Sequence, residues 1–164
     1  LLAGIMLDTK NFVLKTGVRT FEAAAYLRRR GATTINVKQM FSDSIETYRE
    51  KVNIVCDAKI YKGCAISVAK GADGDVRLAS AQAADELLTL ENVKASFVIY
   101  ESSGKICISA RSFGAVNVQI IMEKLGGGGH QTMSATQLSD INKEQALKML
   151  IDVIDTNLED ASCK

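Results

Sequence analysis

The sequence lacks proline entirely and contains a single histidine, His130, among its 164 residues. Without proline, the ends of helices and strands must be marked by glycine, asparagine and clusters of polar residues. One histidine and no Cys-x-x-Cys pair exclude the usual ligand sets of a structural zinc site. No apolar run approaches the roughly 20 residues that span a bilayer, so we expect no membrane contact by this segment. No basic stretch precedes an apolar one in the manner of a secretory signal.

An excess of charge of one sign is also missing. The chain has 20 basic and 19 acidic side chains, which leaves a net charge of +1. This balance argues against a protein that coats long nucleic acids, because such proteins need a basic groove. Hydrophobic residues make up 47% and charged residues 24%, an ordinary globular composition. The length of 164 residues fits one domain, or one domain and part of another.

The four cysteines, Cys56, Cys64, Cys107 and Cys163, follow no metal-binding spacing. The first three lie in apolar, strand-like runs, which predicts small buried side chains in a reducing compartment. We therefore expect a cytoplasmic location.

The first 51 residues combine an apolar run with two helical patterns. Leu1–Leu7 is almost wholly apolar and fits either a buried strand or the end of a buried helix. A helix is expected over Thr20–Arg30, with Thr20 as its N-cap, cations in its last turn and Gly31 at its end. Residues 41–48 carry apolar side chains at helical spacing. The charged residues 49–51 follow and predict a domain boundary.

The remaining residues, 52–164, alternate between strand and helix patterns. The expected helices begin at Ser80, Val118 and Asn142, the last with Gln145 as its capping-box partner. Strands and helices interleaved in this way predict an α/β fold in which a mixed β-sheet is packed with helices. The expected strands are 52–58, 64–69, 95–100, 106–110 and 132–136, with a turn at 73–75 and a hairpin loop at 101–105.

Four consecutive glycines, Gly126, Gly127, Gly128 and Gly129, lead directly into His130. Glycine tolerates positive φ and leaves its backbone N–H open to a phosphate oxygen, and histidine can donate to a phosphate or bind a metal. The alternative is a flexible loop after a helix, followed by a solvent-exposed histidine. Because the C-terminus of a helix disfavours anions, the loop itself must hold any phosphate.

Arg111 comes at the end of an expected strand. Ile106, Ile108 and Ala110 share one face of that strand, so Arg111 falls on the other. Ligand groups gather at strand ends in α/β sheets, and a guanidinium can clamp a phosphate with two hydrogen bonds. The alternative is an ordinary surface arginine.

Asp8 directly follows the apolar run at the start of the sequence. A carboxylate at the end of a buried element is well placed for a divalent cation. The alternative is a cap or an Asx-turn for the loop that follows. One carboxylate does not make a metal site by itself.

Several of these features occur together in one known pattern. The segments Ile108–Ser112, Asn117–Gln119 and Met122–His130 together resemble the DHHA1 domain of the DHH phosphoesterase superfamily. Leu1–Thr9 resembles the last metal-binding motif of the preceding DHH domain. The segment Phe12–Arg30 is similar to GdpP-type (YybT-like) bacterial cyclic-di-AMP phosphodiesterases. The resemblance thus covers essentially the whole chain.

The resemblance implies a division into two parts. Residues 1–51 correspond to the C-terminal part of a DHH catalytic domain, and residues 52–164 to a DHHA1 substrate-binding domain. Asp8 corresponds to a ligand of a two-metal manganese (Mn²⁺) centre. The Asp-His-His motif of the superfamily is absent from the sequence. We therefore expect this chain alone to bind nucleotide weakly and not to hydrolyse it.

The resemblance also implies which residues contact the substrate. Arg111 and the Gly126–His130 loop correspond to the groups that hold nucleotide phosphates. Ser112 and Asn117 belong to the same motif, and we expect them in the substrate-binding set.

The expected function is the nucleotide-binding part of a phosphodiesterase that converts cyclic-di-AMP to pApA. A nanoRNase or pAp phosphatase of the same superfamily, and a non-catalytic RNA-binding DHHA1 module, are the alternatives. The implied partners are a cyclic dinucleotide or short oligonucleotide, an upstream DHH domain and, as a further option, a second copy of the chain. The parent protein is expected to be tethered to the cell membrane by helices outside this segment.

Overall fold

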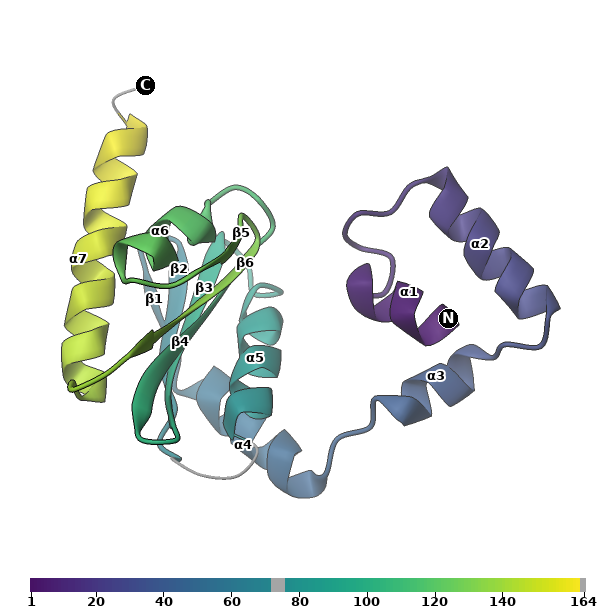
Figure 1. Ribbon diagram of the computed structural model, residues 1–164, viewed down its shortest axis with the longest axis horizontal. Coiled ribbons are helices and arrows are strands. Elements are labelled where there is room, and N and C mark those ends of the chain that lie inside the picture. Colours follow the sequence, from purple (N-terminus) through teal and green to yellow (C-terminus); the bar gives the residue numbers. More distant parts are fainter. Residues whose placement is uncertain (72–75, 163–164) are drawn as a thin grey trace. The chain divides into compact units, whose positions relative to one another are not determined.

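A computed structural model of the protein describes residues 1–71 and 76–162 (Figure 1). The turn expected at 73–75 and Cys163 therefore lie outside the described residues. Helices and strands interleave along the chain in an α/β arrangement, as the sequence predicts.

The chain divides into two compact units, Leu1–Ser44, here called the N-terminal unit, and Ile45–Lys164, here called the sheet unit. The division falls before the boundary expected at residues 49–51, because helix α4 (Ile45–Cys56) belongs to the sheet unit. Ile54 of this helix is 2% exposed and packs among the apolar side chains of the sheet unit.

The N-terminal unit consists of the helices α1 (Leu2–Asp8), α2 (Val18–Arg29) and α3 (Thr34–Met40). The ambiguous apolar run at the start of the sequence is thus a helix. Helix α2 begins earlier than expected, because its N-cap is Gly17 and not Thr20. The N–H of Gly17 donates to the hydroxyl of Thr20 at 3.3 Å, so Thr20 supports the first turn from inside the helix.

A six-stranded sheet with the strand order β1-β2-β3-β4-β6-β5 forms the centre of the sheet unit. Strands β2 and β3 are parallel and the other neighbouring strands are antiparallel, which confirms the expected mixed sheet. The strands are β1 (Lys59–Tyr61), β2 (Cys64–Val68), β3 (Ala95–Ser102), β4 (Lys105–Ser112), β5 (Gly128–His130) and β6 (Met133–Leu138).

Helices pack on both faces of this sheet (Figure 1). Helices α4 and α5 (Val76–Leu87) lie on one face, and α6 (Val118–Lys124) and α7 (Lys143–Ser162) lie on the other. Val98 of β3 belongs to the first core and its neighbour Phe97 to the second, because successive strand residues point to opposite faces. Both side chains are fully buried.

The strand expected at 52–58 is wrong, since most of this segment is the second half of α4. Thr47 and Ile54 are the buried residues of this helix, and they lie seven positions apart on one side of it. Burial against α5 and the sheet therefore follows a helical period. The apolar alternation over 52–58 does not correspond to two faces of a strand.

The described cysteines are free thiols. Cys64 and Cys107 are buried, as expected, whereas Cys56 at the end of α4 is exposed, contrary to expectation. Burial raises the pKa of the Cys64 thiol to about 11, so at neutral pH this side chain packs as a small uncharged group.

Two expected helix caps have opposite outcomes. Helix α5 already includes Val76, so Ser80 is a buried residue inside the helix and not its cap. At the start of α7, the N–H of Asn142 donates to Gln145 Oε1 at 2.9 Å, and the N–H of Gln145 donates to Asn142 Oδ1 at 2.8 Å. This reciprocal pair confirms the expected capping box.

Candidate functional site

A row of side chains crosses neighbouring strands at one end of the sheet. The strand register places Arg111 of β4 opposite Met133 of β6, and Met133 opposite His130 of β5. On its other side, Arg111 lies opposite Ser96 of β3. Directly opposed residues of antiparallel strands project from the same face of a sheet. Arg111 and His130, which the resemblance assigns to one phosphate-binding set, are therefore on one face with Met133 between them.

This face is the one against which α5 packs. The hydroxyl of Ser96 donates to the carbonyl of Ala84 in α5 at 2.5 Å. Further along the sheet, Met133, Ala135 and Gln137 are exposed on β6, while the residues between them are buried on the opposite face. The uncovered surface, here called the open face, is formed by Arg111, His130, Met133, Ala135 and Gln137.

Arg111 is held within this face and is not an ordinary surface arginine. Its side chain is 11% exposed, and its Nη1 donates to Ser109 Oγ at 3.1 Å and to the Ala110 carbonyl at 2.9 Å. Its Nε lies 3.2 Å from Asp85 Oδ1 of α5. Nη1 is thus hydrogen-bonded, whereas the buried Nε makes no hydrogen bond and has Asp85 as its ion-pair partner. Asp85 and Ser109 were not suggested by the sequence, because no local motif links α5 to β4.

The glycine run is not a simple loop, because Gly128–His130 forms the edge strand β5. A Cβ on Gly127 would lie 2.7 Å from Thr136 Cα, and one on Gly129 would lie 2.6 Å from Ser134 Cα. A Cβ on Gly128 would meet no atom within 4 Å. Two of the glycines thus allow β5 to lie close against β6, and Gly128 leaves its backbone uncrowded.

His130 is the last residue of β5, and the two residues Gln131 and Thr132 turn the chain into β6. The N–H of Thr132 points to Nδ1 of His130 at 3.5 Å, and the hydroxyl of Thr132 lies 3.4 Å from the same atom. A ring that accepts at Nδ1 carries its proton on Nε2 when neutral. In the tautomer that accepts at Nδ1, the exposed imidazole presents an N–H donor at Nε2.

Backbone hydrogen bonds fix the tip of this hairpin to the neighbouring elements. The N–H of Ser112, at the end of β4, donates to the Thr132 carbonyl at 3.0 Å. The N–H of Val118, at the start of α6, donates to the Gln131 carbonyl at 3.0 Å. The loop that carries His130 is therefore tied to the strand that carries Arg111.

Ser112 and Asn117, also expected in the site, make contacts within the connection from β4 to the first turn of α6, and the Ser112 hydroxyl also lies 3.4 Å from the Gln131 carbonyl of the β5–β6 hairpin. The Ser112 hydroxyl donates to the Val116 carbonyl at 2.6 Å and accepts from the Gly114 N–H at 3.2 Å. Asn117 is the N-cap of α6, and its Oδ1 accepts from the Gln119 N–H at 3.1 Å. Both side chains shape the connection between β4 and α6.

Asp8 is exposed at the end of α1 in the N-terminal unit. The residues after Thr9 form a tight turn in which Lys10, Asn11 and Phe12 have φ values of 47°, 56° and 67°. Positive φ is unfavourable for residues with a Cβ, so this turn stores backbone strain. The Thr9 hydroxyl accepts from the Phe12 N–H at 2.9 Å and helps to hold the turn.

A metal centre is not assembled by the described part of the chain. Within residues 1–71 and 76–162, no three or more histidine, cysteine, aspartate or glutamate side chains come together in a way that could hold a metal ion. Asp8 alone does not fit a two-metal centre, which needs several carboxylate and histidine ligands. Among the same residues, no helix is long and apolar enough to cross a membrane.

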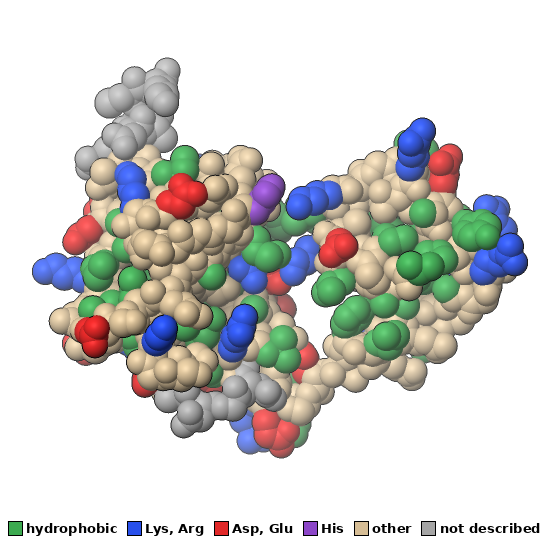
Figure 2. Space-filling view, in the orientation of Figure 1, with side chains coloured by type: hydrophobic (Ala, Val, Ile, Leu, Met, Phe, Trp, Pro, Cys, Tyr) green, Lys and Arg blue, Asp and Glu red, His purple; other side chains and the backbone are tan. Residues whose placement is uncertain are grey.

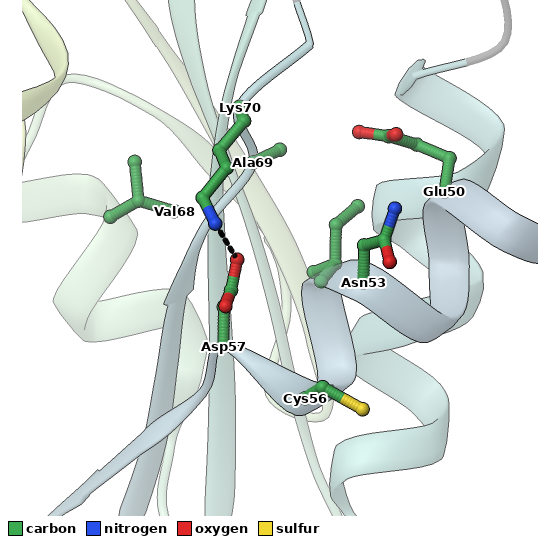
Figure 3. A pocket seen from close by; sticks show the side chains of 8 residues that line it. Glu50, Asn53, Cys56, Asp57, Val68, Ala69 and Lys70 are labelled. Carbon is green, nitrogen blue, oxygen red and sulfur yellow. Dashed lines mark ion pairs between the residues drawn. The ribbon is translucent and has the colours of Figure 1, made fainter.

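A separate cavity of about 250 Å³ lies between α4 and β2 (Figure 3). Glu50 and Asn53 lie on its helical side and Ala69 on the other, and Lys70 Nζ pairs with Asp57 Oδ2 at 2.7 Å across it. None of the binding or metal-ligand residues predicted from the sequence lines this cavity.

Comparison with known proteins identifies the sheet unit. Residues 61–156 match the DHHA1 domain family. The chain belongs to this family. Its DHHA1 match spans the whole row from Ser96 through Arg111 to His130 and Met133.

Curated relatives of this DHHA1 protein are similar to it over nearly its full length. It is 50% identical over 157 residues to the cyclic-di-AMP phosphodiesterase PdeA of Listeria monocytogenes, covering 94% of this chain and 24% of that protein. It is 44% identical over 164 residues to the cyclic-di-AMP phosphodiesterase GdpP of Bacillus subtilis, covering 97% and 25%. The chain thus spans about a quarter of the length of these relatives.

Among solved structures, an exopolyphosphatase-related protein of Bacteroides fragilis superposes with a TM-score of 0.81. The match covers 93% of this chain and 47% of that one at 20% sequence identity. At this identity, the similarity shows a shared fold.

Proposed function

We propose that this chain is the nucleotide-binding portion of a manganese-dependent phosphodiesterase that hydrolyses cyclic-di-AMP to pApA. The observation that carries the proposal is the placement of Arg111 and His130 in one row on the open face. Two relatives at 50% and 44% identity are cyclic-di-AMP phosphodiesterases, which supports this choice of substrate.

The spacing of the row suits a dinucleotide. Arg111 and His130 are separated by one intervening strand, so their backbones lie roughly 10 Å apart at the usual strand spacing. Both side chains are long enough to reach toward a common ligand. The guanidinium of Arg111 takes phosphate oxygens through N–H groups that Ser109 and Ala110 do not use. His130 donates to a phosphate oxygen from Nε2.

The Gly126–Gly129 run contributes by bringing β5 close to β6, which places His130 beside Met133. The uncrowded backbone at Gly128 lies on the outer edge of the sheet and is accessible to a ligand. Ser112 and Asn117 contribute by fixing the loop that follows Arg111. In this proposal, the residues of the sheet unit bind and orient the substrate.

The proposal assigns one metal ligand to this chain. In the complete protein, Asp8 would supply a carboxylate to a manganese centre whose other ligands lie outside the described residues. Bound metal ions supply the activation of water and the stabilisation of phosphoryl charge in such enzymes. The strained turn after Asp8 supports a functional role for this position, because strain is concentrated at functional sites.

The N-terminal unit supports the presence of a larger catalytic domain in the complete protein. Val18, Ile35 and Met40 are 75%, 70% and 72% exposed. Figure 2 shows hydrophobic side chains over the surface of this unit. We propose that the rest of a DHH domain covers them, in a protein about four times the length of this chain, like its curated relatives.

Calorimetric titration of the chain with pApA and with cyclic-di-AMP tests the phosphate contacts. We expect Arg111→Ala and His130→Ala each to raise the Kd about tenfold or more, since a hydrogen bond to a charged group contributes about 1.5–3 kcal/mol. Lys148→Ala removes an exposed cation from α7, on the other side of the sheet, and should leave the Kd unchanged.

Binding by both site variants at the affinity of the unchanged chain would contradict the proposed phosphate contacts. Stronger binding of pAp than of either dinucleotide would favour a pAp phosphatase instead. Addition of Mn²⁺ should produce no turnover by this chain alone, and a clear manganese-dependent turnover would contradict the proposal that further ligands are needed.

A further inference from the structure

Asp85 connects helix α5 to the row of side chains on the open face. Its Oδ1 lies 3.2 Å from Nε of Arg111, and the two side chains are 33% and 11% exposed. Asp85 belongs neither to the glycine run nor to the motif around Arg111. Its position comes from the packing of α5 on β3, where Ser96 bonds to Ala84, the residue just before Asp85.

The burial of Arg111 creates a need for such a group. An arginine side chain that is nearly nine-tenths buried loses much of its hydration, and this loss is unfavourable unless nearby groups compensate the charge. Ser109 and the Ala110 carbonyl are neutral acceptors, and both contact Nη1. The carboxylate of Asp85 supplies the compensating negative charge on the Nε side.

These contacts leave a defined part of the guanidinium available. Within the described residues, Nη2 of Arg111 has no hydrogen-bond partner, whereas Nη1 has two and Nε faces Asp85. The two hydrogen bonds of Nη1, together with the carboxylate beside Nε, restrict the orientation of the planar guanidinium, although Nε itself makes no hydrogen bond. The remaining N–H groups therefore keep one direction instead of sampling many rotamers, which lowers the entropy lost when an anion binds.

We infer that Asp85 is a positioning residue for phosphate binding, which acts by orienting Arg111. This inference rests on the proposed function, because it requires Arg111 to contact a phosphate. Asp85 itself carries the wrong charge to contact an anion. Its direct electrostatic effect on a bound phosphate is repulsive, and its benefit arises only through Arg111.

Asp85 orients Arg111 but also repels a bound anion, so removing Asp85 should have different effects on the Kd with and without Arg111. With Arg111 present, Asp85→Ala releases the guanidinium, and the Kd for pApA should rise about fivefold. In an Arg111→Ala background, nothing remains to be oriented. The same Asp85→Ala change then only removes a negative charge from an anion site, and it should leave the Kd unchanged or lower it. A purely structural role of Asp85 would weaken binding in both backgrounds.

The test is a double-mutant cycle by calorimetry with pApA, with a melting curve for each variant. Glu86→Ala is the matched control, because it removes a neighbouring exposed carboxylate from the same helix and should leave the Kd unchanged. Asp85→Asn keeps the size of the side chain without its charge. Asp85→Asn is the second variant in the cycle. With Arg111 present, it should raise the Kd less than Asp85→Ala does. In the Arg111→Ala background, it should leave the Kd unchanged or lower it.

The outcomes separate the inference from the function on which it rests. If Arg111→Ala weakens binding and Asp85→Ala behaves like Glu86→Ala, the positioning role is wrong and the proposed function stands. If the Asp85 variants weaken binding equally in both backgrounds, the positioning role is also wrong. If Arg111→Ala itself binds pApA normally, the proposed phosphate contact fails.

Discussion

The two compact units of this chain use their apolar residues very differently. In the sheet unit, Phe97 and Ile108 are completely buried in a core between the sheet and two helices. In the N-terminal unit, the buried hydrophobic side chains are Leu2 and Val37, although all three of its helices are well formed. Short helices gain most of their stability from packing and not from their own hydrogen bonds, so we expect the N-terminal unit to be much less stable by itself than the sheet unit.

The largest expected difference between the units comes from removing an aromatic side chain. Phe97→Ala in the sheet unit should lower the free energy of unfolding by about 3–5 kcal/mol, because it leaves a cavity in a closed core. Phe21 in the N-terminal unit is 54% exposed and stacks on Phe12 at 5.4 Å. Phe21→Ala should lower it by at most about 1.5 kcal/mol. Urea denaturation followed by circular dichroism measures the free energy of unfolding of both variants. An equal decrease in the two variants would contradict the expected difference in packing between the units.

A second difference concerns glycine. Gly127→Ala and Gly129→Ala would force a methyl group into β6, and each should destabilise the sheet unit by about 1–3 kcal/mol. Gly128→Ala is the internal control, since its Cβ meets nothing within 4 Å. Gly4 lies inside α1, and a Cβ at this position would also meet no atom within 4 Å. Because alanine favours helix more than glycine does, Gly4→Ala should stabilise that helix by up to about 1 kcal/mol. Melting temperatures should thus move in opposite directions, and a tolerated Gly127→Ala would refute the close packing of β5 on β6.

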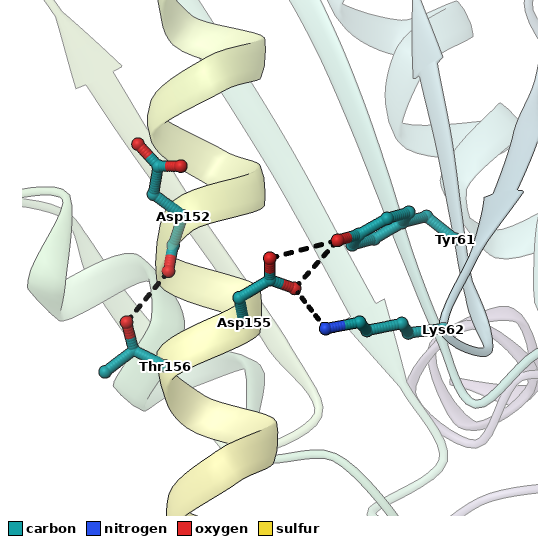
Figure 4. A network of polar contacts seen from close by, with 5 residues as sticks. All are labelled: Tyr61, Lys62, Asp152, Asp155 and Thr156. Carbon is teal, nitrogen blue, oxygen red and sulfur yellow. Dashed lines mark hydrogen bonds and ion pairs between the residues drawn. The ribbon is translucent and has the colours of Figure 1, made fainter.

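The smallest expected effect is a pH dependence confined to the sheet unit (Figure 4). Asp155 of α7 accepts from Tyr61 Oη at 2.9 Å and pairs with Lys62 Nζ at 2.8 Å, next to β1. The hydrogen bond from Lys62, followed by that from Tyr61, lowers the pKa of Asp155 below its ordinary value of 3.8. The folded state therefore gains stability above the ordinary pKa and loses it as the pH falls through the lowered pKa.

Denaturation series between pH 7 and pH 2 check this prediction against Asp155→Asn. The unchanged chain should lose more stability than the variant as the pH falls below about 4. Parallel curves for the two proteins would show that this contact contributes nothing to the pH dependence.

The sequence was sufficient to predict features that depend on neighbouring residues. The capping box of Asn142 and Gln145 and the hairpin between β3 and β4 both depend on residues close in sequence, and both are present. The face of Arg111 follows from alternation along its own strand, and the register agrees with it. The position of His130 beside Met133 could not be predicted, because the short strand β5 has glycine where strands usually carry bulky side chains.

Features that depend on packing between distant elements were missed. The helical identity of α4 is decided by the burial of Ile54 against α5 and the sheet, which apolar alternation alone does not reveal. The contact of Asp85 with Arg111 depends on how α5 lies across β3. Charges on a helix surface are common, so nothing in the local pattern distinguishes Asp85 from Glu86.

The hydrogen bonds at the tip of the β5–β6 hairpin have a consequence for how the open face moves. The Ser112 amide donates to the Thr132 carbonyl, and the Val118 amide donates to the Gln131 carbonyl. The hairpin tip is therefore hydrogen-bonded both to the end of β4 and to the start of α6. Exchange of these two amides with deuterated solvent then requires the tip to detach. We therefore expect Arg111 and His130 to belong to a single cooperative opening unit, in which neither side chain leaves the proposed ligand-binding face by local fraying alone.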